Sequence, residues 1–403
     1  MQYNILFLTL GNIDLNERNL YTEFINAISK NNINIFIVSP NEKRKGLPDD
    51  LIEHKNIKIL KVKTGNITKS SNIIEKGIST LKLQRQYIKA IKKYFSDIDF
   101  DMVVYSTPPI TFDKVIKYMK RKHNSSSYLM LKDIFPQNAV DLGMFSKKSL
   151  VYKYFRKKEK ILYEHSDFIG CMSQGNINYL LENNNINPNK VELFPNAIIP
   201  KDICKTSGRS YLLKYGVPEG KTLFVYGGNI GVPQGIEYIK EVVSKFNQVH
   251  SSFLLIVGSG AKFNELKDTI EMNDIRNVKV LNRLPKDEYD ELLKVADVGL
   301  VFLDYRFTIP NIPSRLTAYM EHSLPTLAAT DPNTDLKDIL YESGSGYWTE
   351  SNNVEKFITL ANTLASDKQK RIEMGKLGRS YLEKNYDVRK NVKTILAHLK
   401  KDD

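Results

Sequence analysis

The second half of the chain repeats one pattern, in which a short apolar run ends in glycine or polar residues. Three such runs are Thr222–Tyr226, Phe253–Val257 and Val278–Leu281. Short apolar runs bounded by turn residues are typical of strands buried in a parallel sheet. Because parallel strands end at the same edge of a sheet, the loops after these runs should share that edge. The repeat therefore predicts an α/β domain with a ligand site at the carboxyl ends of its strands.

A helix start follows a fourth apolar run, Val298–Leu303. Pro313 and Ser314 form the start signal, because Ser caps free backbone N–H groups and Pro is tolerated in a first turn. A helix start carries partial positive charge, and Arg315 adds a full charge beside it. We expect this position to bind a phosphate or diphosphate. The alternative is an ordinary helix beside a loop.

Glycines follow two of these strands. Gly228 lies in the run Gly227–Gly231, and Gly258 and Gly260 follow the next strand. Glycine lets backbone N–H groups approach a phosphate closely. Each glycine motif is weakly specific alone. The loops after the three apolar runs share one edge, however, and together with the helix start they indicate a phosphate site.

The first half opens with a βαβ pattern: a strand at 4–10, a helix at 17–30 and a strand at 33–39. This order implies a second parallel sheet. Gly11 follows the first strand, where it either lines a ligand crevice or is a plain turn residue. The opening lacks the full glycine fingerprint of dinucleotide-binding domains, so we predict no NAD site.

A polar cluster, Lys132–Asn138, follows the apolar strand Tyr128–Leu131. Catalytic groups of α/β enzymes lie at the carboxyl ends of strands. Asp133 is therefore the leading catalytic candidate of the first half. The alternative is an aspartate that caps the loop.

Positive charge is concentrated in the first half. The chain has a net charge of +13, and residues 1–200 hold 30 Lys and Arg against 19 Asp and Glu. Three helices there are basic, and the one at 147–164 carries aromatic residues as well, which is typical of a membrane-surface element. The residues of this helix that we expect to contact the membrane or the acceptor are Lys153, Arg156, Lys157 and Lys158. The alternatives are a solvated surface helix and a nucleic-acid binder, but no nucleic-acid motif is present.

Several classes of protein are excluded by composition. Two cysteines, Cys171 and Cys204, cannot form a zinc cluster alone, and their small number fits a reducing cytoplasm. No apolar run approaches the roughly 18 residues that span a bilayer. The first ten residues have no basic segment and resemble a strand instead of a secretory signal. We expect a cytoplasmic protein that is peripheral on the inner face of the cell membrane.

Length and pattern predict two domains. The N-terminal domain covers 1–200 and the C-terminal domain 210–385, with a linker from Pro195 to about 209. A last helix covers 386–403, with its apolar residues at helical spacing.

Together these motifs resemble retaining glycosyltransferases of the GT-B type, in particular glycosyltransferase family 4 of bacterial surface-polysaccharide synthesis. The segments that carry the resemblance are Phe194–Ala197, Gly227–Gly235, Leu254–Gly260, Asn282–Pro285, Ala296–Val298, Pro313–Arg315 and Lys132–Pro136. The resemblance implies an α/β fold of two Rossmann-like domains facing each other across a cleft. It also implies that the C-terminal helix returns toward the N-terminal domain.

The resemblance implies a set of donor-binding residues: Gly11, Gly228, Asn229, Gln234, Gly258, Gly260, Arg283, Leu284, Pro313, Ser314, Arg315 and Glu321. Asn229 and Gln234 stand where the family usually has Arg and Lys. The family's two glutamates fall on Pro310 and Ala318, so both carboxylates are absent. Glu321, one turn further along, is the candidate substitute.

The implied activity is transfer of a sugar, with retention, from a nucleotide-diphosphate sugar such as a UDP-sugar. The implied acceptor is a polyprenyl-diphosphate-linked saccharide of capsule or other cell-surface polysaccharide synthesis. Asp133 would orient or deprotonate the acceptor hydroxyl, and Arg315 would stabilise the leaving diphosphate, without an obligatory metal or other cofactor. The alternatives are a catalytically lapsed partner subunit and a nucleotide-sugar 2-epimerase, whose acidic segments are not found.

Overall fold

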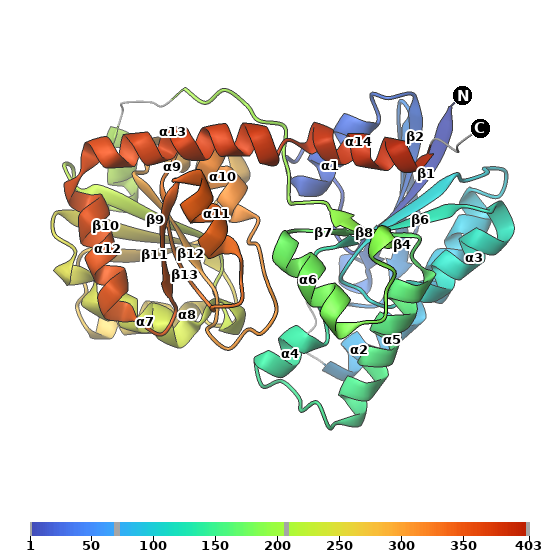
Figure 1. Ribbon diagram of the computed structural model, residues 1–403, viewed down its shortest axis with the longest axis horizontal. Coiled ribbons are helices and arrows are strands. Elements are labelled where there is room, and N and C mark those ends of the chain that lie inside the picture. The colour runs from blue at the N-terminus through green and yellow to red at the C-terminus, as the bar shows by residue number, and fades with distance from the viewer. Residues whose placement is uncertain (1, 68–72, 205–208, 400–403) are drawn as a thin grey trace. The chain divides into compact units, whose positions relative to one another are not determined.

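The computed structural model describes residues 2–67, 73–204 and 209–399 (Figure 1). The chain divides into two compact units. Unit 1 consists of Met1–Ile199 with Val388–Asp403, and unit 2 consists of Pro200–Asp387. Part of the predicted linker, 205–208, lies outside the described residues.

Unit 1 contains an eight-stranded sheet with the strand order β3-β4-β2-β1-β5-β6-β7-β8. All neighbours pair in parallel except β3, which is antiparallel to β4. The strands are β1 (Tyr3–Leu8), β2 (Ile33–Glu42), β3 (Asp50–His54), β4 (Ile57–Thr64), β5 (Met102–Ser106), β6 (Ser126–Leu131), β7 (Phe168–Cys171) and β8 (Val191–Leu193). No apolar run predicts β3, because this edge strand is largely exposed and carries charged residues.

Seven α-helices belong to the described part of unit 1. They are α1 (Leu20–Ile28), α2 (Ile73–Tyr94), α3 (Asp113–His123), α4 (Gln137–Asp141), α5 (Leu150–His165), α6 (Gln174–Asn183) and α14 (Val388–Leu399). Asn19 caps α1 through the N–H groups of Tyr21 and Thr22. The last helix, α14, packs beside α1 on one face of the sheet, as expected for a returning C-terminal helix (Figure 1).

Unit 2 contains a six-stranded parallel sheet with the order β11-β10-β9-β12-β13-β14. The strands are β9 (Thr222–Asn229), β10 (Ser252–Ser259), β11 (Val278–Asn282), β12 (Val298–Phe302), β13 (Thr326–Thr330) and β14 (Gly346–Glu350). From β9 the chain builds the sheet outward through β10 and β11, and then returns to the other side of β9 for β12. Both sheets confirm the predicted α/β class.

The α-helices of unit 2 cover both faces of its sheet. They are α7 (Ile236–Lys245), α8 (Phe263–Met272), α9 (Lys286–Val295), α10 (Arg315–Glu321), α11 (Leu336–Ser343), α12 (Val354–Ser366) and α13 (Lys368–Asn385). One core joins α7, α8 and α12 to the sheet through residues such as Val243, Leu266, Phe357 and Leu254. Short 3₁₀ turns occur at Lys43–Lys45, Pro188–Lys190, Arg209–Tyr215, Val232–Gln234 and Phe246–Gln248.

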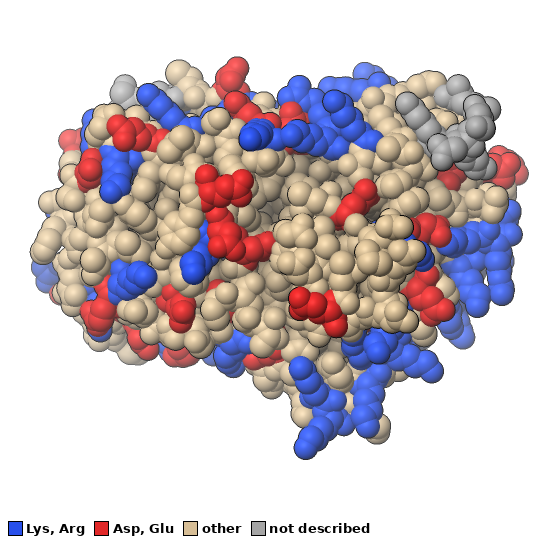
Figure 2. Space-filling model, in the orientation of Figure 1, with Lys and Arg blue, Asp and Glu red and all other residues tan. Residues whose placement is uncertain are grey.

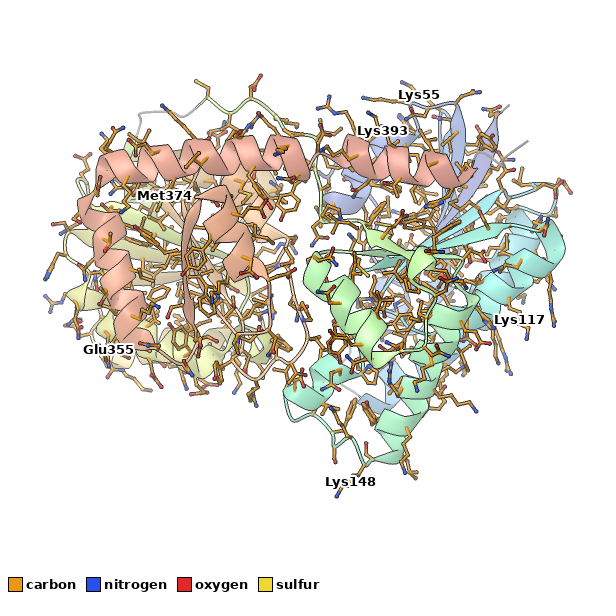
Figure 3. All side chains as sticks on the ribbon, in the orientation of Figure 1. Lys55, Lys117, Lys148, Glu355, Met374 and Lys393 are labelled. Atoms are coloured by element: carbon orange, nitrogen blue, oxygen red, sulfur yellow. The ribbon has the colours of Figure 1, made fainter. Side chains whose placement is uncertain are left out.

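The described residues include no helix that combines the length and apolar character needed to cross a bilayer. The surfaces of the helices carry charged side chains, such as Lys117 on α3 and Lys393 on α14 (Figure 3).

We predict that Ile395→Ala destabilises unit 1, although residue 395 follows the whole of unit 2 in sequence. Ile395 is fully buried in the core that α14 shares with α1 and β1. Truncating a buried isoleucine leaves a cavity that costs about 2–4 kcal/mol. Urea unfolding of the full chain, with hydrogen exchange of the β1 and α1 amides, measures the loss. The exposed Lys393→Ala is the matched control, and equal stability of the two variants would contradict the packing described.

Candidate functional site

The strand order of unit 2 creates one position where neighbouring connections diverge. From β9 the chain crosses toward β10, whereas β12 lies on the other side of β9. In open parallel sheets, ligands bind in the crevice at the carboxyl ends of the two strands that flank such a switch point. The loops at this position are 229–235 after β9 and 303–314 after β12. Gly228, Gly258, Gly260 and Arg315, all singled out from the sequence, belong to this edge.

The loop after β9 is held in a fixed shape by hydrogen bonds. The amide of Ile230 donates to Ser259 O (3.0 Å), and the Tyr226 hydroxyl donates to Asn229 O (2.6 Å). Asn229 Nδ2 donates to Gln234 Oε1 (2.5 Å). The two predicted donor-binding side chains Asn229 and Gln234 therefore bridge the loop at its ends.

Gly258 and Gly260 allow the end of β10 to approach this loop closely. A Cβ atom on Gly258 would lie 1.9 Å from Gly228 O, and one on Gly260 would lie 2.1 Å from Ile230 O. Both contacts are with backbone atoms, so neither neighbour could move aside cheaply. This packing explains why both positions 258 and 260 are glycine. Direct contact of these two glycines with a donor stays a prediction.

Arg315 lies directly against Gly228. Its guanidinium is 4.4 Å from the centre of the Tyr226 ring, a cation–π contact. Gly228 has φ +146°, and a Cβ there would lie 2.8 Å from Arg315 Nη2. Arg315 Nη1 is buried and has no hydrogen-bond partner among the residues that the structure describes. A side chain at position 228 would thus collide with the cation that the sequence analysis singled out.

Tyrosines surround this arginine. The Tyr319 hydroxyl accepts from the Gly227 amide (3.3 Å) and donates to Leu300 O (3.0 Å). Burial by itself would lower the pKa of Arg315, but the neighbouring tyrosine side chains outweigh it and the pKa is raised. Arg315 therefore remains a cation at this edge. No sequence motif assigns Tyr319 to this site; its position one turn after Arg315 is the signal that could have identified it.

The expectation that Ser314 caps the helix is wrong. Ser314 already has helical dihedral angles, and its side chain makes no capping bond. The turn begins one residue earlier, because the Leu316 amide donates to Pro313 O (3.1 Å). Helix α10 spans only Arg315–Glu321, so the charge at this position comes from Arg315 and not from a long helix.

The segment between β12 and α10 is anchored to the loop after β13. The Thr334 hydroxyl accepts from the Asn311 amide (3.0 Å) and donates to Asn311 O (2.5 Å). Asn333 Nδ2 donates to Phe307 O (2.7 Å), and Asp331 accepts from the amides of Asn333 and Thr334. These bonds fix the chain that leads into Arg315. No sequence motif predicts the role of Asp331, Asn333 and Thr334 in holding this segment.

The other predicted donor-binding residues of unit 2 lie in different surroundings. Arg283 is exposed and Leu284 is partly buried, after the edge strand β11. Glu321 is buried at the far end of α10, where its Oε1 accepts from the Lys201 amide (2.9 Å). That carboxylate thus has a structural partner, and its contact with a ribose stays a prediction.

Asp133 lies at the carboxyl end of β6 in unit 1. Its Oδ1 accepts from Asn138 Nδ2 (2.8 Å), and its amide donates to Thr107 Oγ1 (3.0 Å). Burial raises the pKa of the Asp133 carboxyl to about 6, although the bond from Asn138 opposes the shift. A carboxyl that titrates near neutral pH is suited to exchange a proton with a hydroxyl.

Two further residues frame the same edge of unit 1. Lys132 Nζ donates to Phe194 O (3.2 Å), and burial lowers the pKa of Lys132 to about 7. Gly11 follows β1, and its amide donates to Thr9 Oγ1 (2.9 Å). Gly11 is thus in a turn at the predicted edge, and its role in donor binding stays a prediction.

The four predicted membrane-facing cations of α5 fall into two pairs. Lys153 and Lys157 are exposed. Arg156 Nη1 is bonded to Glu159 Oε2 (2.5 Å), and its Nη2 donates to Asn183 O (2.7 Å). Lys158 Nζ lies 3.2 Å from Asp113 Oδ2 on α3. Arg156 and Lys158 therefore hold helices of unit 1 together, which the sequence alone could not reveal.

Across residues 2–67, 73–204 and 209–399, no three His, Cys, Asp or Glu side chains are grouped as a metal site. The carboxyl edges therefore offer glycine amides, arginines and one perturbed aspartate as their chemical groups.

Residues 211–381 match the protein family described as Glycosyl transferases group 1. The "Probable glycosyltransferase WbjE" of Pseudomonas aeruginosa is 25% identical over 291 residues, which cover 71% of each chain. The "Putative colanic acid biosynthesis glycosyl transferase WcaI" of Escherichia coli K12 is 30% identical over 101 residues, 25% of each chain.

The fold is also similar to solved structures over nearly the whole chain. Sucrose-phosphate synthase of Thermosynechococcus elongatus matches with a TM-score of 0.78 at 14% identity, covering 99% of both chains. Anabaena HepE, solved in complex with UDP, matches with a TM-score of 0.71 at 14% identity, also covering 99% of both chains.

We predict that Asp133→Asn stabilises the protein above pH 6 and has little effect near pH 4. The folded state holds the Asp133 proton more tightly than the unfolded chain does, since burial raises the folded pKa from 3.8 to about 6. The stability that this group contributes is therefore lost as pH rises from about 4 to 6. A neutral amide avoids that loss, which is worth about 1–3 kcal/mol.

Urea unfolding of the full chain at pH 4.5 and pH 8 measures this effect. Asp97→Asn, at an exposed position of unit 1, is the matched control. A variant that is equally or less stable than the wild type at pH 8 would contradict the raised pKa of the Asp133 carboxyl.

Proposed function

We propose that the protein transfers a sugar from a UDP-sugar to a lipid-linked saccharide. The premise is that residues 211–381 match the Glycosyl transferases group 1 family and that the chain has the GT-B fold. The proposed setting is bacterial cell-surface polysaccharide synthesis, with retention of the anomeric configuration. The observation that carries the donor assignment is the contact of Arg315 with Gly228 at the switch point of unit 2.

Sugar transfer breaks the bond between the anomeric carbon and a diphosphate oxygen, and it forms a bond from that carbon to an acceptor oxygen. Negative charge develops on the leaving diphosphate. We assign its stabilisation to backbone N–H groups near Gly228 and to Arg315, which the raised pKa keeps charged. These groups are fixed by the loop bonds already described, so little reorganisation accompanies the reaction. UDP in the HepE complex supports the choice of nucleotide.

The acceptor hydroxyl must lose its proton as the new bond forms. We assign this proton to Asp133, because its pKa of about 6 leaves the carboxylate ionised at neutral pH and still basic. The side chain of Asn138 and the backbone of Ile134 both hydrogen-bond to this carboxyl and fix its orientation toward the hydroxyl that we propose it deprotonates. The name of WcaI, which includes colanic acid biosynthesis, supports a saccharide acceptor of the cell surface.

The membrane assignment rests on one end of unit 1, here called the basic tip: loop 142–149 and the first turns of α5. Its exposed lysines are Lys147, Lys148, Lys153 and Lys157. Large apolar side chains stand among them; Leu150 is 81% exposed and Met144 is 73% exposed. Figure 2 shows Lys and Arg side chains gathered at this end, and Lys148 points outward from it in Figure 3. Lysines around exposed apolar groups are suited to an anionic bilayer surface.

A second function is favoured by one sequence feature. Pro310 and Ala318 stand where the family's two glutamates fall, so the usual ribose-binding carboxylate is absent. A catalytically lapsed partner subunit would share the fold but bind no nucleotide. Calorimetric titration with UDP, GDP, CDP and ADP, each with and without Mg²⁺, separates the two functions. Tight binding of one nucleotide supports the enzyme, and no binding by any of them supports the lapsed subunit.

We predict that Asp133→Asn lowers turnover by about 10²–10⁴-fold, since it removes the group assigned to the acceptor proton. UDP affinity should be unchanged, because the proposed donor site lies in unit 2. The wild-type rate should rise with pH and level off above about 6, when the carboxyl is ionised. Transfer from UDP-sugars to lipid-linked saccharides measures the rate, with Asp97→Asn as the control. Full activity of Asp133→Asn would overturn the assignment.

We predict that Lys148→Ala with Lys153→Ala weakens binding to phosphatidylglycerol-containing vesicles by about 30-fold, since each lysine near an anionic surface contributes about 1 kcal/mol. Vesicle sedimentation measures the change. The control is Lys55→Ala with Lys117→Ala, which removes two exposed lysines of unit 1 outside the basic tip (Figure 3). Equal loss in both pairs would indicate general charge attraction, against a specific docking surface.

A further inference from the structure

The carboxyl edge of unit 2 needs positive charge if it binds a diphosphate, yet the loop after β9 supplies none. Residues 229–235 contain no Lys or Arg. Among the described loops and helix starts at this edge, the main cations are Lys262, Arg283, Lys286, Arg306 and Arg315. Lys262 is bonded to Glu265 (2.6 Å). Arg283 and Lys286 both follow the outermost strand, β11, and Lys286 is paired with Asp290. Arg306 and Arg315 remain, and both come from the segment that follows β12 at the switch point.

Arg306 is held by a forked ion pair. Its Nε donates to Asp304 Oδ1 and its Nη2 to Asp304 Oδ2, both at 2.8 Å. The Arg306 amide also donates to Asp304 Oδ1 (3.0 Å). The Arg306 side chain is 51% exposed, whereas that of Asp304 is 10% exposed. The fork uses two of the three guanidinium nitrogens, and Nη1 has no partner among the described residues.

The same pair lies against the glycine-rich loop. The Asp304 amide donates to Pro233 O (3.0 Å). Gly235 has φ +67°, and a Cβ there would lie 3.3 Å from Asp304 Cα. Asp304, which holds the Arg306 guanidinium, therefore packs on the loop between β9 and α7. Phe307 O is in turn bonded by Asn333, so the backbone is fixed on both sides of Arg306, at Asp304 and at Phe307.

We propose that Arg306 is a donor-binding residue that supplies the second cation for the diphosphate, beside Arg315. Its free Nη1 and its half-exposed position allow it to meet a phosphate oxygen, and Asp304 fixes its orientation. The inference deepens the proposed function and rests on it. It also accounts for Asn229 and Gln234: the charge that these positions lack is provided from the other side of the switch point.

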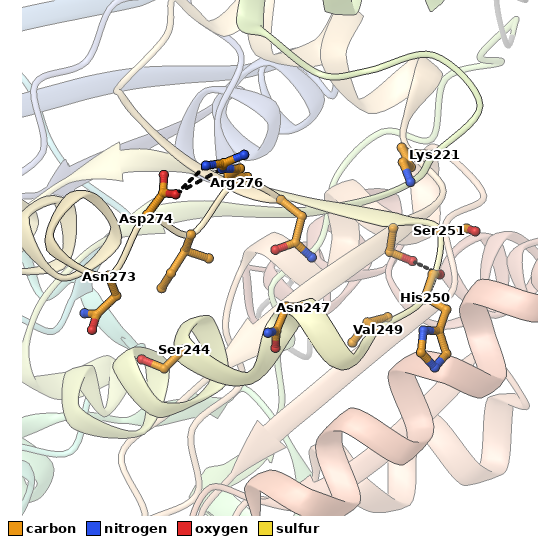
Figure 4. A pocket seen from close by; sticks show the side chains of 12 residues that line it. Lys221, Ser244, Asn247, Val249, His250, Ser251, Asn273, Asp274 and Arg276 are labelled. Carbon is orange, nitrogen blue, oxygen red and sulfur yellow. Dashed lines mark hydrogen bonds and ion pairs between the residues drawn. The ribbon is translucent and has the colours of Figure 1, made fainter.

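Unit 2 contains a matched control for this arginine. Asp274, Ile275 and Arg276 repeat the Asp-x-Arg spacing, with Arg276 Nε and Nη2 bonded to Asp274 Oδ2 at 3.0 and 2.7 Å. This pair precedes β11, so it lies at the amino edge of the same sheet. It lines a pocket of about 640 Å³ there (Figure 4). Arg276→Ala thus removes the same charge from the same unit, away from the switch point.

The test compares UDP and uridine binding by calorimetry in the full chain. Arg306→Ala should weaken UDP binding by about 10- to 100-fold, the range for loss of a hydrogen bond between charged groups. Uridine binding should be unchanged, because uridine has no phosphate. Arg306→Lys keeps the charge and should retain most of the affinity, while Arg276→Ala should equal the wild type for both ligands.

The outcomes separate the two proposals. If wild-type protein binds neither UDP nor any other nucleoside diphosphate, the proposed function fails. If the wild type binds UDP and Arg306→Ala binds it equally well, the donor site stands and the role of Arg306 is overturned. Equal weakening of UDP and uridine by Arg306→Ala would also overturn it, since this indicates a distorted loop and not a lost phosphate contact. Near-UV circular dichroism of each variant checks the fold.

Discussion

Parallel pairing of β9 with β10 on one side and β12 on the other is the constraint on which the candidate donor site depends. Because all three strands run in the same direction, their loops emerge at one edge. Gly228, Arg306 and Arg315 are separated by up to 87 positions in sequence, yet this pairing places their segments together. A strand reversed at β12 would move both arginines to the opposite edge. The chemistry at this edge therefore follows from strand direction before any side chain is considered.

The shape of the loop after β9 depends largely on glycines, which have no side chain. Gly228, Gly258 and Gly260 admit a guanidinium or a neighbouring backbone where a Cβ would collide. Asn229 and Gln234 bond to each other across the loop. An arginine or lysine at either position would break that bridge. The shape of the loop and the absence of cations in it are thus two aspects of one arrangement.

The sequence predicts most of the strands, because short apolar runs between turn residues leave few alternatives, but β3, β13 and β14 are not among those predicted. It also places Asp133, since residues that follow a buried strand lie at the carboxyl edge. Three features are not given by the strand pattern, and two of them depend on contacts between distant parts of the chain. Ser314 does not cap because the chain turns one residue earlier. Arg156 donates to Asn183 O at the end of α6, and Lys158 pairs with Asp113 on α3. Arg306 can be assigned to the donor site only once β12 is known to pair with β9, because that pairing brings its loop to the glycine-rich loop.

The position of α14 has a consequence for synthesis. Unit 1 is interrupted in sequence, because Val388–Leu399 complete its core only after all of unit 2. At about 5–20 residues per second, a ribosome needs roughly 10 to 40 s to translate the intervening segment. During that time the nascent chain presents the apolar face of β1 and α1 without its last helix. Chaperone binding to the emerging protein should therefore concentrate on β1 and α1, and should end once α14 has emerged and packed against them.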